Sequence, residues 1–164
     1  MNDISDIPAN SSVFVDSNVI TYFLLKHKNL YPSCRKFLRR IEKGEIKGFL
    51  NSVVISEVYF IYIRVKLSEL LKIPPYKVMK EVKKKPKLLN KVDLLPVDMF
   101  FSIPNLFLVH PHFTYLSAVI SRNKLLPSDA LHLATMTSNN IMNIATNDTD
   151  FDGIKGITLW KPYG

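Results

Sequence analysis

The sequence predicts one α/β domain, a sandwich whose central sheet is short and mainly parallel. Short apolar runs rich in β-branched residues alternate along the chain with longer segments of helical periodicity, which is the pattern of βαβ units. The 164 residues suit a single domain, and 47% hydrophobic with 22% charged residues is ordinary for a globular protein. The chain contains no internal repeat and no low-complexity linker that would divide it.

The first third of the chain predicts two strands and two helices. Residues 13–16 (VFVD) form a β-branched and aromatic run, typical of a buried strand, that ends at Asp16. An apolar helix is expected over residues 18–26. A second helix should cover residues 32–43, because a proline suits its first turn and a glycine follows its end. Residues 48–51 predict the next strand.

The middle of the chain predicts one long helix and several short elements. Residues 53–71 are too long and too evenly apolar for a strand, so we expect a largely buried helix that stops before two prolines. Residues 76–91 hold seven lysines and one acid, which predicts a solvated basic helix followed by a loop. The prolines within residues 92–111 allow only short elements.

The last third predicts two helices and two strands. One helix is expected over residues 113–124 and another from Pro127, with an inward stripe made of Ala130, Leu133 and Ala134. Strands are expected over residues 141–146 and 157–160, separated by the acidic turn NDTDFD.

The charge of the chain favours a polyanionic partner. A formal net charge of +8 and a pI near 9.5 bias a small protein toward nucleic acids, although lysines kept for solubility would give the same balance. The predicted helix over residues 32–43 should bury Phe37, Leu38 and Ile41. It should leave a row of cations in water, namely Arg35, Lys36, Arg39, Arg40 and Lys43.

The compartment suggested by the sequence is the cytoplasm. The first ten residues are polar and slightly acidic, unlike a secretory signal, and no apolar stretch approaches the roughly 18 residues of a membrane span. The single cysteine, Cys34, cannot close an intramolecular disulfide, which fits a reducing environment.

Four separate segments each place a carboxylate beside apolar sequence. Asp16 ends a predicted strand, and Glu57 interrupts the apolar helix. Asp129 lies in the first turn of a helix, while Asp148 follows the strand over residues 141–146. Because the carboxyl ends of parallel strands share one edge where ligands bind, these acids can converge. Converging carboxylates need cations, and oxygen ligands with no accompanying histidine or cysteine favour Mg²⁺ or Mn²⁺.

Each acid also has a structural explanation when it is considered alone. Asp16 could cap the following helix, and Asp129 could be favoured by a helix dipole. Asp148 and Asp152 could be turn residues. Glu57 is the hardest to explain in this way, but it could pair with a nearby cation such as Arg64 or Lys66. These explanations weaken jointly, because four segments deliver an acid in the same kind of context.

Four motifs, in order, resemble those of PIN-domain nucleases over about residues 13 to 160. They are VFVDSNVITYFL, ISEVYF, SDALHLAT and TNDTDF. The resemblance implies a three-layer α/β/α sandwich that hydrolyses RNA phosphodiesters with a water activated by one or two Mg²⁺ or Mn²⁺ ions. It implies that four residues are catalytic and hold the metal: Asp16, Glu57, Asp129 and Asp148. Asp150 would replace or supplement Asp148, and Ser17, Asn18 and Thr146 would orient the acids.

The small size of the chain makes it most similar to the VapC-type toxin ribonucleases. That resemblance implies a cognate antitoxin partner and a homodimer. We divide the chain into an N-terminal extension, residues 1–12, and a single nuclease domain, residues 13–164. Additional RNA contact is expected in the lysine-rich segment, at Lys80, Lys83 and Lys84.

Three other functions remain compatible with parts of the sequence. A catalytically silent PIN domain could serve as an RNA-binding or assembly module, but it would not need four costly carboxylates. A PIN nuclease could act on DNA or in RNA maturation instead of as a toxin. An aspartate-centred phosphatase or phosphoreceiver domain would need a tight acidic pair near the first strand, where this chain has Asp16, Ser17 and Asn18.

Overall fold

A six-stranded sheet forms the centre of the protein. The computed structural model describes residues 2–112 and 115–163. The strand order is β1-β6-β5-β2-β3-β4, and every pairing among the described residues is parallel. The strands are β1 (Asn2–Asp3), β2 (Ser12–Val15), β3 (Lys47–Leu50), β4 (Leu106–Leu108), β5 (Asn143–Ala145) and β6 (Thr158–Lys161). The prediction of a short, parallel central sheet is confirmed.

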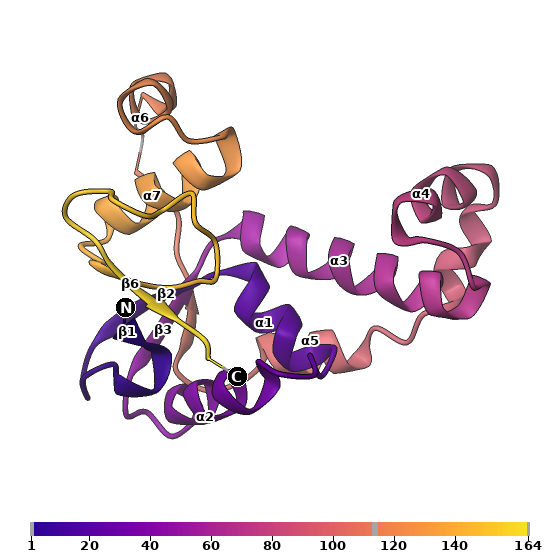
Figure 1. The fold of residues 1–164 in the computed structure, drawn as a ribbon, viewed down its shortest axis with the longest axis horizontal. Helices are drawn as coiled ribbons and strands as arrows, with labels where there is room; N and C mark the ends of the chain where they lie inside the picture. Colours follow the sequence, from indigo (N-terminus) through magenta and orange to yellow (C-terminus); the bar gives the residue numbers. More distant parts are fainter. Residues whose placement is uncertain (1, 113–114, 164) are drawn as a thin grey trace.

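Helices cover both faces of this sheet. The α-helices are α1 (Ser17–Leu24), α2 (Tyr31–Glu42), α3 (Ser52–Leu71), α4 (Pro75–Lys84), α5 (Leu95–Phe101), α6 (Leu116–Asn123) and α7 (Pro127–Ser138). Two short 3-10 helices are η1 (Ile4–Asp6) and η2 (Pro86–Lys91). In Figure 1, α2 lies below the sheet, α1 lies to its right and α7 lies above it. The predicted three-layer α/β/α architecture is therefore confirmed.

The central strands are buried because both of their faces are covered. Val13, Phe14 and Val15 of β2 and Ile144 and Ala145 of β5 have no exposed surface. Such continuous apolar runs are expected of parallel strands that lie between two helical layers. The inner stripe predicted for α7 is also buried, with Ala130, Leu133 and Ala134 at most 7% exposed.

The N-terminal residues extend the sheet and the core. β1 pairs with β6 at the edge of the sheet, and Ile4 and Ile7 are buried in the main hydrophobic cluster. The Arg40 guanidinium donates to the carbonyl oxygens of Ser5 and Ile7 at 3.0 and 2.7 Å. Arg40 was expected in water, and this prediction is wrong because its side chain fastens the N-terminal segment onto α2.

Helix α3 projects from the body of the molecule (Figure 1) and carries α4 and η2 at its far end, so that α3, α4 and η2 together form an arm. The prediction of a largely buried helix is wrong. Val54 and Val58 pack in the main core, but Phe60 and Leu70 are 44% and 52% exposed. A uniformly apolar helix usually lies inside a protein, because exposing such residues on every side is unfavourable. Here α3 makes a second, small core with α4, centred on Leu67.

Most predicted elements are present with bounds shifted by a few residues. The segment after α4 is the 3-10 helix η2 instead of a loop, and residues 92–111 contain the short α5 and β4. The helix predicted over 113–124 is observed from Leu116, while residues 113–114 lie outside the described part of the chain. Across the described residues, no helix has both the length and the apolar character needed to cross a membrane.

Candidate metal centre

The candidate site lies where β2 and β5 end. These two strands are neighbours, and their parallel register places Val15 beside Ala145. The next residues along the two strands, Asp16 and Thr146, are therefore adjacent at the carboxyl edge of the sheet. This edge is where parallel α/β sheets bind their ligands. Asp16 is also the N-cap of α1. Its backbone is still extended, and its side chain accepts a hydrogen bond from the N–H of Ser17, the first residue of the helix.

The carboxylate of Asp16 is held by four hydrogen bonds. Its Oδ1 accepts from the Ser17 backbone N–H at 2.6 Å and from the Ser17 hydroxyl at 3.3 Å. Its Oδ2 accepts from the Asn18 side-chain amide and from the Thr146 hydroxyl, both at 2.6 Å. Asp16 is only 5% exposed. Charge-assisted bonds of this kind fix the direction of a buried carboxylate.

The same polar groups connect Asp16 to the acidic turn after β5. The Thr146 hydroxyl oxygen accepts from the Asn18 amide at 3.0 Å and from the backbone N–H of Asp148 at 2.9 Å. The Asn18 amide oxygen accepts from the Asn147 N–H at 3.0 Å. Ser17, Asn18 and Thr146 thus all contact Asp16, and two of them also order the turn that carries Asp148.

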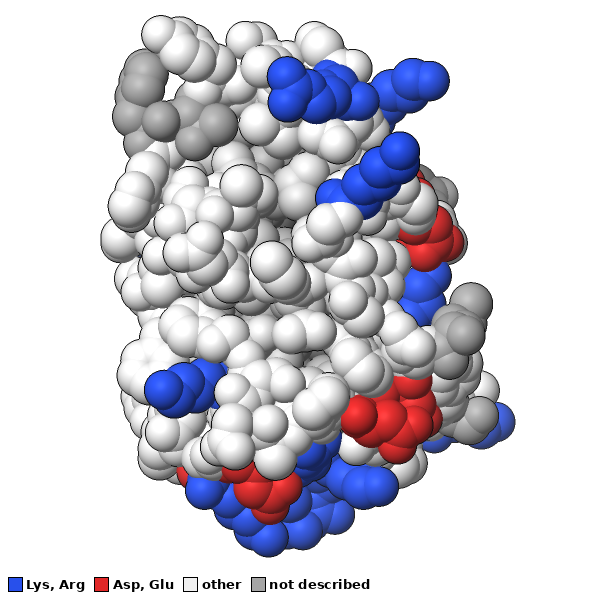
Figure 2. All heavy atoms as spheres, turned by 90° about the vertical axis from the view of Figure 1, so that its left-hand side faces the viewer, with Lys and Arg blue, Asp and Glu red and all other residues white. Residues whose placement is uncertain are grey.

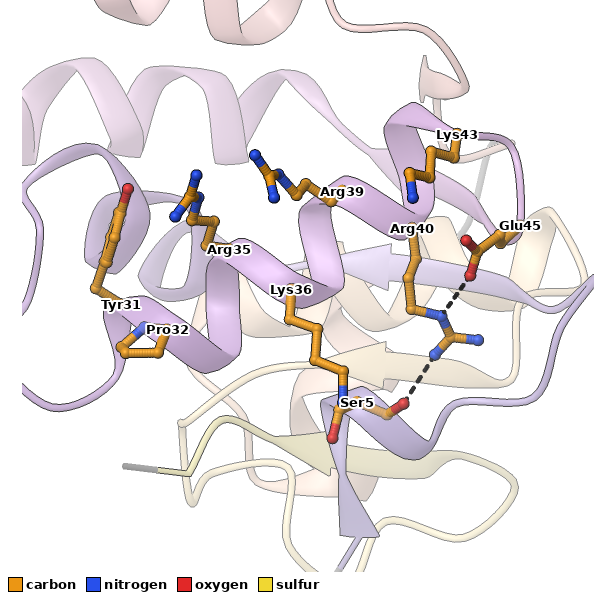
Figure 3. Close-up of a pocket in the computed structure, with 9 residues that line it drawn as sticks. All are labelled: Ser5, Tyr31, Pro32, Arg35, Lys36, Arg39, Arg40, Lys43 and Glu45. Carbon is orange, nitrogen blue, oxygen red and sulfur yellow. Dashed lines mark hydrogen bonds and ion pairs between the residues drawn. The ribbon is translucent and has the colours of Figure 1, made fainter.

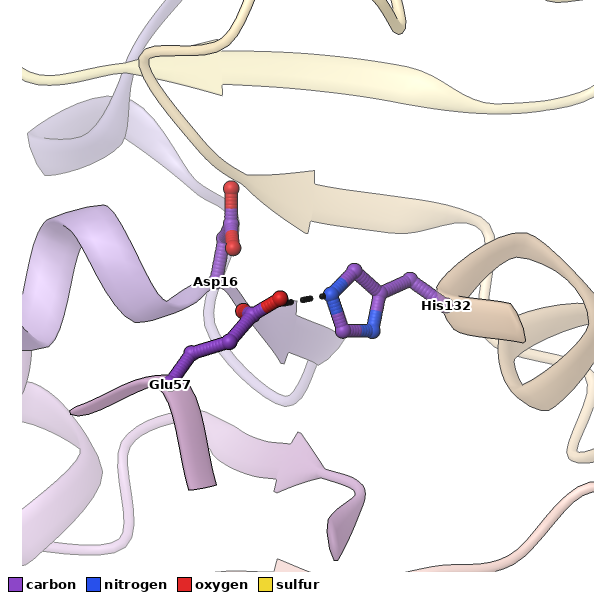
Figure 4. A group of neighbouring side chains, drawn as sticks. All are labelled: Asp16, Glu57 and His132. Atoms are coloured by element: carbon purple, nitrogen blue, oxygen red, sulfur yellow. Dashed lines mark ion pairs between the residues drawn. The ribbon is translucent and has the colours of Figure 1, made fainter. Parts of the chain in front are cut away.

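Glu57 and His132 complete a compact group with Asp16 (Figure 4). One potential ligand atom from each of these three residues lies within 4.8 Å of the other two. Glu57 lies on α3, and its Oε2 is 3.6 Å from Nε2 of His132 on α7. The site therefore draws on the ends of β2 and β5 and on two helices. The proposed pairing of Glu57 with Arg64 or Lys66 is wrong, because Lys66 pairs with Glu69 and Arg64 lies over Phe60.

His132 is the site residue that sequence reasoning missed. The acids were expected to have no accompanying histidine, and this expectation is wrong. His132 is 1% exposed and packs against the Phe14 ring, with ring centroids 5.4 Å apart. The available signal was its spacing, because a residue three positions after Asp129 lies on the same face of a helix.

The other predicted acids surround this group at greater distance. Among the described residues, Asp129 and Asp148 are not within the compact group, although both are half-buried. Asp148 Oδ1 accepts the backbone N–H of Asp150 at 2.9 Å, while Asp150 itself is exposed. Asp152, further along the turn, pairs with Lys161 at 3.0 Å and so has a structural role.

The surroundings shift the pKa values of three of these acids, and not all in the same direction. Burial raises the pKa of Asp16 above its usual range, against the opposing effect of the Thr146 hydrogen bond. Burial also raises the pKa of Asp129 to about 6, and the charges of Asp148, Asp150 and Asp16 add to the rise, against an opposing effect of His132. For Glu57, burial is outweighed by the hydrogen bonds from His132 and Ser17, so its pKa is lowered. The raised pKa values of Asp16 and Asp129, in a group of neighbouring acids, mark this place as a candidate functional site.

Asp129 should make the metal-free protein sensitive to pH. A folded-state pKa of about 6, raised from 3.8, means that the folded protein binds this proton more tightly than the unfolded chain does. The resulting stability is complete below about pH 4 and is lost as the pH rises through 6. Relative to wild type, Asp129→Asn should therefore be more stable by about 1 kcal/mol at pH 7.5, after allowance for solvent screening.

Urea unfolding of both proteins at pH 4 and at pH 7.5, in chelator, measures this effect. The free energy of unfolding should be higher for Asp129→Asn than for wild type at pH 7.5, and the two values should nearly coincide at pH 4. If Asp129→Asn were less stable than wild type at pH 7.5, the raised pKa of Asp129 would be contradicted.

The predicted RNA-contact lysines lie away from these acids. Lys80, Lys83 and Lys84 are exposed on α4, at the far end of the arm. Lys84 pairs with Glu81 at 2.9 Å. Cys34 lies in the core, where burial raises its thiol pKa to about 12, so it cannot serve as a nucleophile at neutral pH.

The donors at this site suit a hard divalent cation. Two buried or half-buried carboxylates converge from different segments, and further acids lie within electrostatic reach. Burying such charges is unfavourable unless a cation or proton neutralises them. Carboxylate oxygens are the ligands that Mg²⁺ and Mn²⁺ prefer, whereas a histidine in the ligand set would also suit ions such as Fe²⁺ or Zn²⁺. The residues present therefore fit a bound metal, and the polar contacts around Asp16 supply the orientation that metal ligands need.

Comparisons with known proteins show which family this chain belongs to. Residues 13–157 match the family model of the PIN domain. Ribonuclease VapC2 of Methanocaldococcus jannaschii is 33% identical over 142 residues, which span 86% of this chain and 87% of that protein. The range matched by the family model, residues 13–157, includes all four segments that carry the candidate acids.

Similar folds occur among solved structures. One of them is the crystal structure of VapBC2 from Rickettsia felis bound to a DNA fragment from its promoter. The alignment covers 92% of this chain and 98% of the matched chain, with a TM-score of 0.53 and 17% identity. A toxin-antitoxin complex from Klebsiella pneumoniae covers 90% of this chain and 96% of that chain, with a TM-score of 0.46 and 19% identity. The first of these supports the fold.

Proposed function

Since the chain belongs to the PIN domain family, we propose that it is a metal-dependent endoribonuclease and the toxin of a toxin–antitoxin pair. The observation that carries this proposal is the meeting of Asp16 and Glu57, from separate segments, at the carboxyl edge of the sheet. The sequence similarity to a VapC ribonuclease extends over most of both chains. A silent binding module would gain nothing from carboxylates that are costly to bury.

In this proposal the acids hold one or two Mg²⁺ or Mn²⁺ ions. The metal ligands would be Asp16, Glu57, Asp129 and Asp148, with Asp150 as a further or alternative ligand. When bound, such ions activate water toward a phosphodiester and stabilise the charge that develops. The chain itself orients Asp16 through Ser17, Asn18 and Thr146, so the carboxylate cannot turn away from the site.

The partners of this nuclease would be RNA, an antitoxin protein and a second copy of the chain. Support for protein partners comes from the arm, which leaves Phe60, Leu70 and Tyr76 between 44% and 77% exposed. Exposed apolar side chains grouped on one projection are typical of an interaction surface. Lys80, Lys83 and Lys84 on the same arm would contact RNA, and the protein would act in the cytoplasm.

Cleavage of RNA under controlled metal conditions tests the proposed activity. The purified protein, freed of metal, should cut a structured RNA when Mg²⁺ or Mn²⁺ is added and should stop when EDTA is in excess. The same RNA with one 2′-deoxy residue at the mapped cleavage site should still be cut, since water and not the 2′-hydroxyl attacks. Undiminished cleavage in EDTA, or dependence on that 2′-hydroxyl, would refute a metal-dependent hydrolysis.

The two aspartates of the turn should differ in importance. Asp148 is half-buried and its N–H is tied to Thr146, whereas Asp150 is exposed. We expect Asp148→Asn to reduce the cleavage rate about 100-fold, because the loss of one carboxylate from a metal site weakens the hold on the metal. An asparagine there can still accept the Asp150 N–H, so the turn should persist. Asp150→Asn should cost less than about tenfold. Cleavage rates at saturating Mn²⁺ decide between them, and a larger loss at Asp150 would reverse the assignment.

A further inference from the structure

A basic groove of about 630 Å³ runs along α2, outside the candidate metal centre (Figure 3). Five cations and one acid line it together with Ser5, Tyr31 and Pro32; the charged residues are Arg35, Lys36, Arg39, Arg40, Lys43 and Glu45. Figure 3 shows Lys36 and Arg40 reaching toward Ser5, with Arg35 and Arg39 on the other flank of the helix. Figure 2 shows Lys and Arg side chains gathered at the same end of the molecule as α2.

Most of these cations have no structural task. Arg40 does, since it bonds to the N-terminal segment and to Glu45, whose charge it neutralises at 3.1 Å. Within residues 2–112 and 115–163, no ion pair involves Arg35, Lys36, Arg39 or Lys43. Arg35, Arg39 and Lys43 follow one another at i, i+4 spacing, an arrangement of like charges that weakens a helix. Because these four side chains form no ion pair within the described part of the chain, their charges are available to an external anion.

The groove reaches the edge of the sheet opposite the metal centre. Glu45 precedes β3, and its carbonyl oxygen accepts the N–H of Asn10, just before β2. This end of the groove therefore lies at the amino ends of the strands, whereas Asp16 and Thr146 lie at the carboxyl ends. Any ligand that touches both places must be long, and a polynucleotide is.

We propose that this groove binds the phosphate backbone of single-stranded RNA and so extends the substrate site beyond the metal centre. This inference rests on the proposed ribonuclease function. Successive cations of the row rise about 6 Å along the helix, a spacing suited to the repeated charges of a polynucleotide. Arginine guanidinium groups bind phosphate oxygens with two parallel hydrogen bonds. The binding is sequence-independent, because backbone contacts position a strand without reading its bases.

Salt-dependent binding of RNA tests the groove. The test protein carries Arg35→Gln, Arg39→Gln and Lys43→Gln, and the matched control carries Arg122→Gln, Lys124→Gln and Lys155→Gln on other exposed surface. Both are made in the Asp16→Asn background and measured in EDTA, so that cleavage does not interfere. A labelled 20-nucleotide unstructured RNA is titrated between 50 and 300 mM KCl.

The groove variant should bind at least about tenfold more weakly at low salt, and its slope of log K against log salt should fall by about 2, near 0.7 for each lost cation. The control should lose less on both measures. Equal behaviour of the two variants would overturn the proposal. Polyglutamate, a polyanion that is not a nucleic acid, is titrated in the same way. A groove variant that keeps its affinity for RNA but no longer binds polyglutamate would also overturn the proposal. Because no metal or cleavage is involved, failure of the metal-centre proposal would leave this result readable.

His132 offers a second inference from independent contacts. The Asn51 amide oxygen caps α3 by accepting the Val54 N–H at 3.1 Å, which fixes the orientation of the amide. The Asn51 nitrogen must then donate, and it faces His132 Nδ1 at 3.2 Å and the Thr135 hydroxyl at 3.0 Å. A neutral imidazole that accepts at Nδ1 carries its proton on Nε2. That N–H faces Glu57 Oε2 at 3.6 Å.

The geometry points to His132 as a positioning residue that aims Glu57 at the metal, and not as a metal ligand. A protonated Nε2 has no lone pair to give to a cation, but it can steady the carboxylate that does. Asn51 sets this tautomer, so the cap of α3 is linked to the acid on the same helix. This inference also rests on the proposed metal centre.

Replacing His132 by residues with and without a donor tests this role. His132→Gln can place an amide N–H near the position of Nε2, whereas His132→Leu fills the space with no donor. Calorimetry should show about tenfold or more weaker Mn²⁺ binding by the Leu variant and near-normal binding by the Gln variant, although both lose thermal stability from the altered packing against Phe14. In cleavage assays the Leu variant should lower kcat more than it changes KM. Equal Mn²⁺ affinities, or equal losses in both variants, would overturn the assignment.

Discussion

Asp16→Asn should reduce RNA cleavage by at least about 100-fold while leaving the protein folded. The carboxylate supplies a charge at the centre of the acidic group, and its neutral isostere cannot neutralise a divalent cation. The fold should persist because asparagine caps a helix as well as aspartate does, and its Oδ1 can still accept the Ser17 N–H. Cleavage of a structured RNA at saturating Mn²⁺, with circular dichroism of both proteins, measures the effect.

A matched control for this substitution is Asp152→Asn. Asp152 lies in the turn after β5 and pairs with Lys161, outside the acidic group. The same chemical change there should alter cleavage less than about twofold. If Asp16→Asn cuts RNA at the rate of wild type or of the Asp152 variant, then Asp16 is not a metal ligand.

Glu57→Gln should also reduce cleavage strongly, but it should affect stability in the opposite direction from Asp129→Asn. The charge of Glu57 is favoured in the folded protein, since the hydrogen bonds from His132 and Ser17 outweigh burial and lower its pKa. A carboxyl group whose pKa is lowered on folding stabilises the folded protein at pH values above its ordinary pKa of 4.5. This stabilisation is lost as the pH falls through the folded-state pKa. The neutral variant should therefore be less stable than wild type at pH 7.5.

Glu69→Gln is the control on the same helix, because Glu69 is exposed and pairs with Lys66, away from the acidic group. We expect a loss of at least about 100-fold in cleavage for Glu57→Gln and almost none for Glu69→Gln. Metal-free melting temperatures should fall for Glu57→Gln and rise for Asp129→Asn. An increase for both would show that the two acids share one environment, contrary to the contacts of Glu57 with His132.

The sheet and the acids could be predicted because their signals are local. The run VFVD predicts a buried strand that ends in an acid, and the helix N-cap at Asp16 follows from the same residues. The register of β2 against β5 then brings Thr146 to Asp16, which only the general rule for parallel sheets could anticipate. The expected contacts of Ser17, Asn18 and Thr146 with Asp16 are observed, and their role at a metal remains a prediction.

The remaining features depend on tertiary contacts that no short segment specifies. The apolar pattern of α3 is the same whether a helix is buried or projects, so the exposure of Phe60 could not be foreseen. Arg40 looks like any surface cation until the N-terminal carbonyls come to meet it. The meeting of His132 with Glu57 joins residues 75 positions apart in the sequence and needs the packing of α7 against the start of α3.

Direct measurement of Mn²⁺ binding tests the central claim, that the acids around Asp16 form a metal centre. Metal-free wild-type protein and Asp16→Asn are titrated with Mn²⁺ by calorimetry at pH 7.5, with Asp152→Asn as the control. One or two saturable sites should be present in wild type and in the control, and binding should be at least about tenfold weaker in Asp16→Asn. Equal binding by wild type and Asp16→Asn, or no saturable binding by wild type, would contradict the claim.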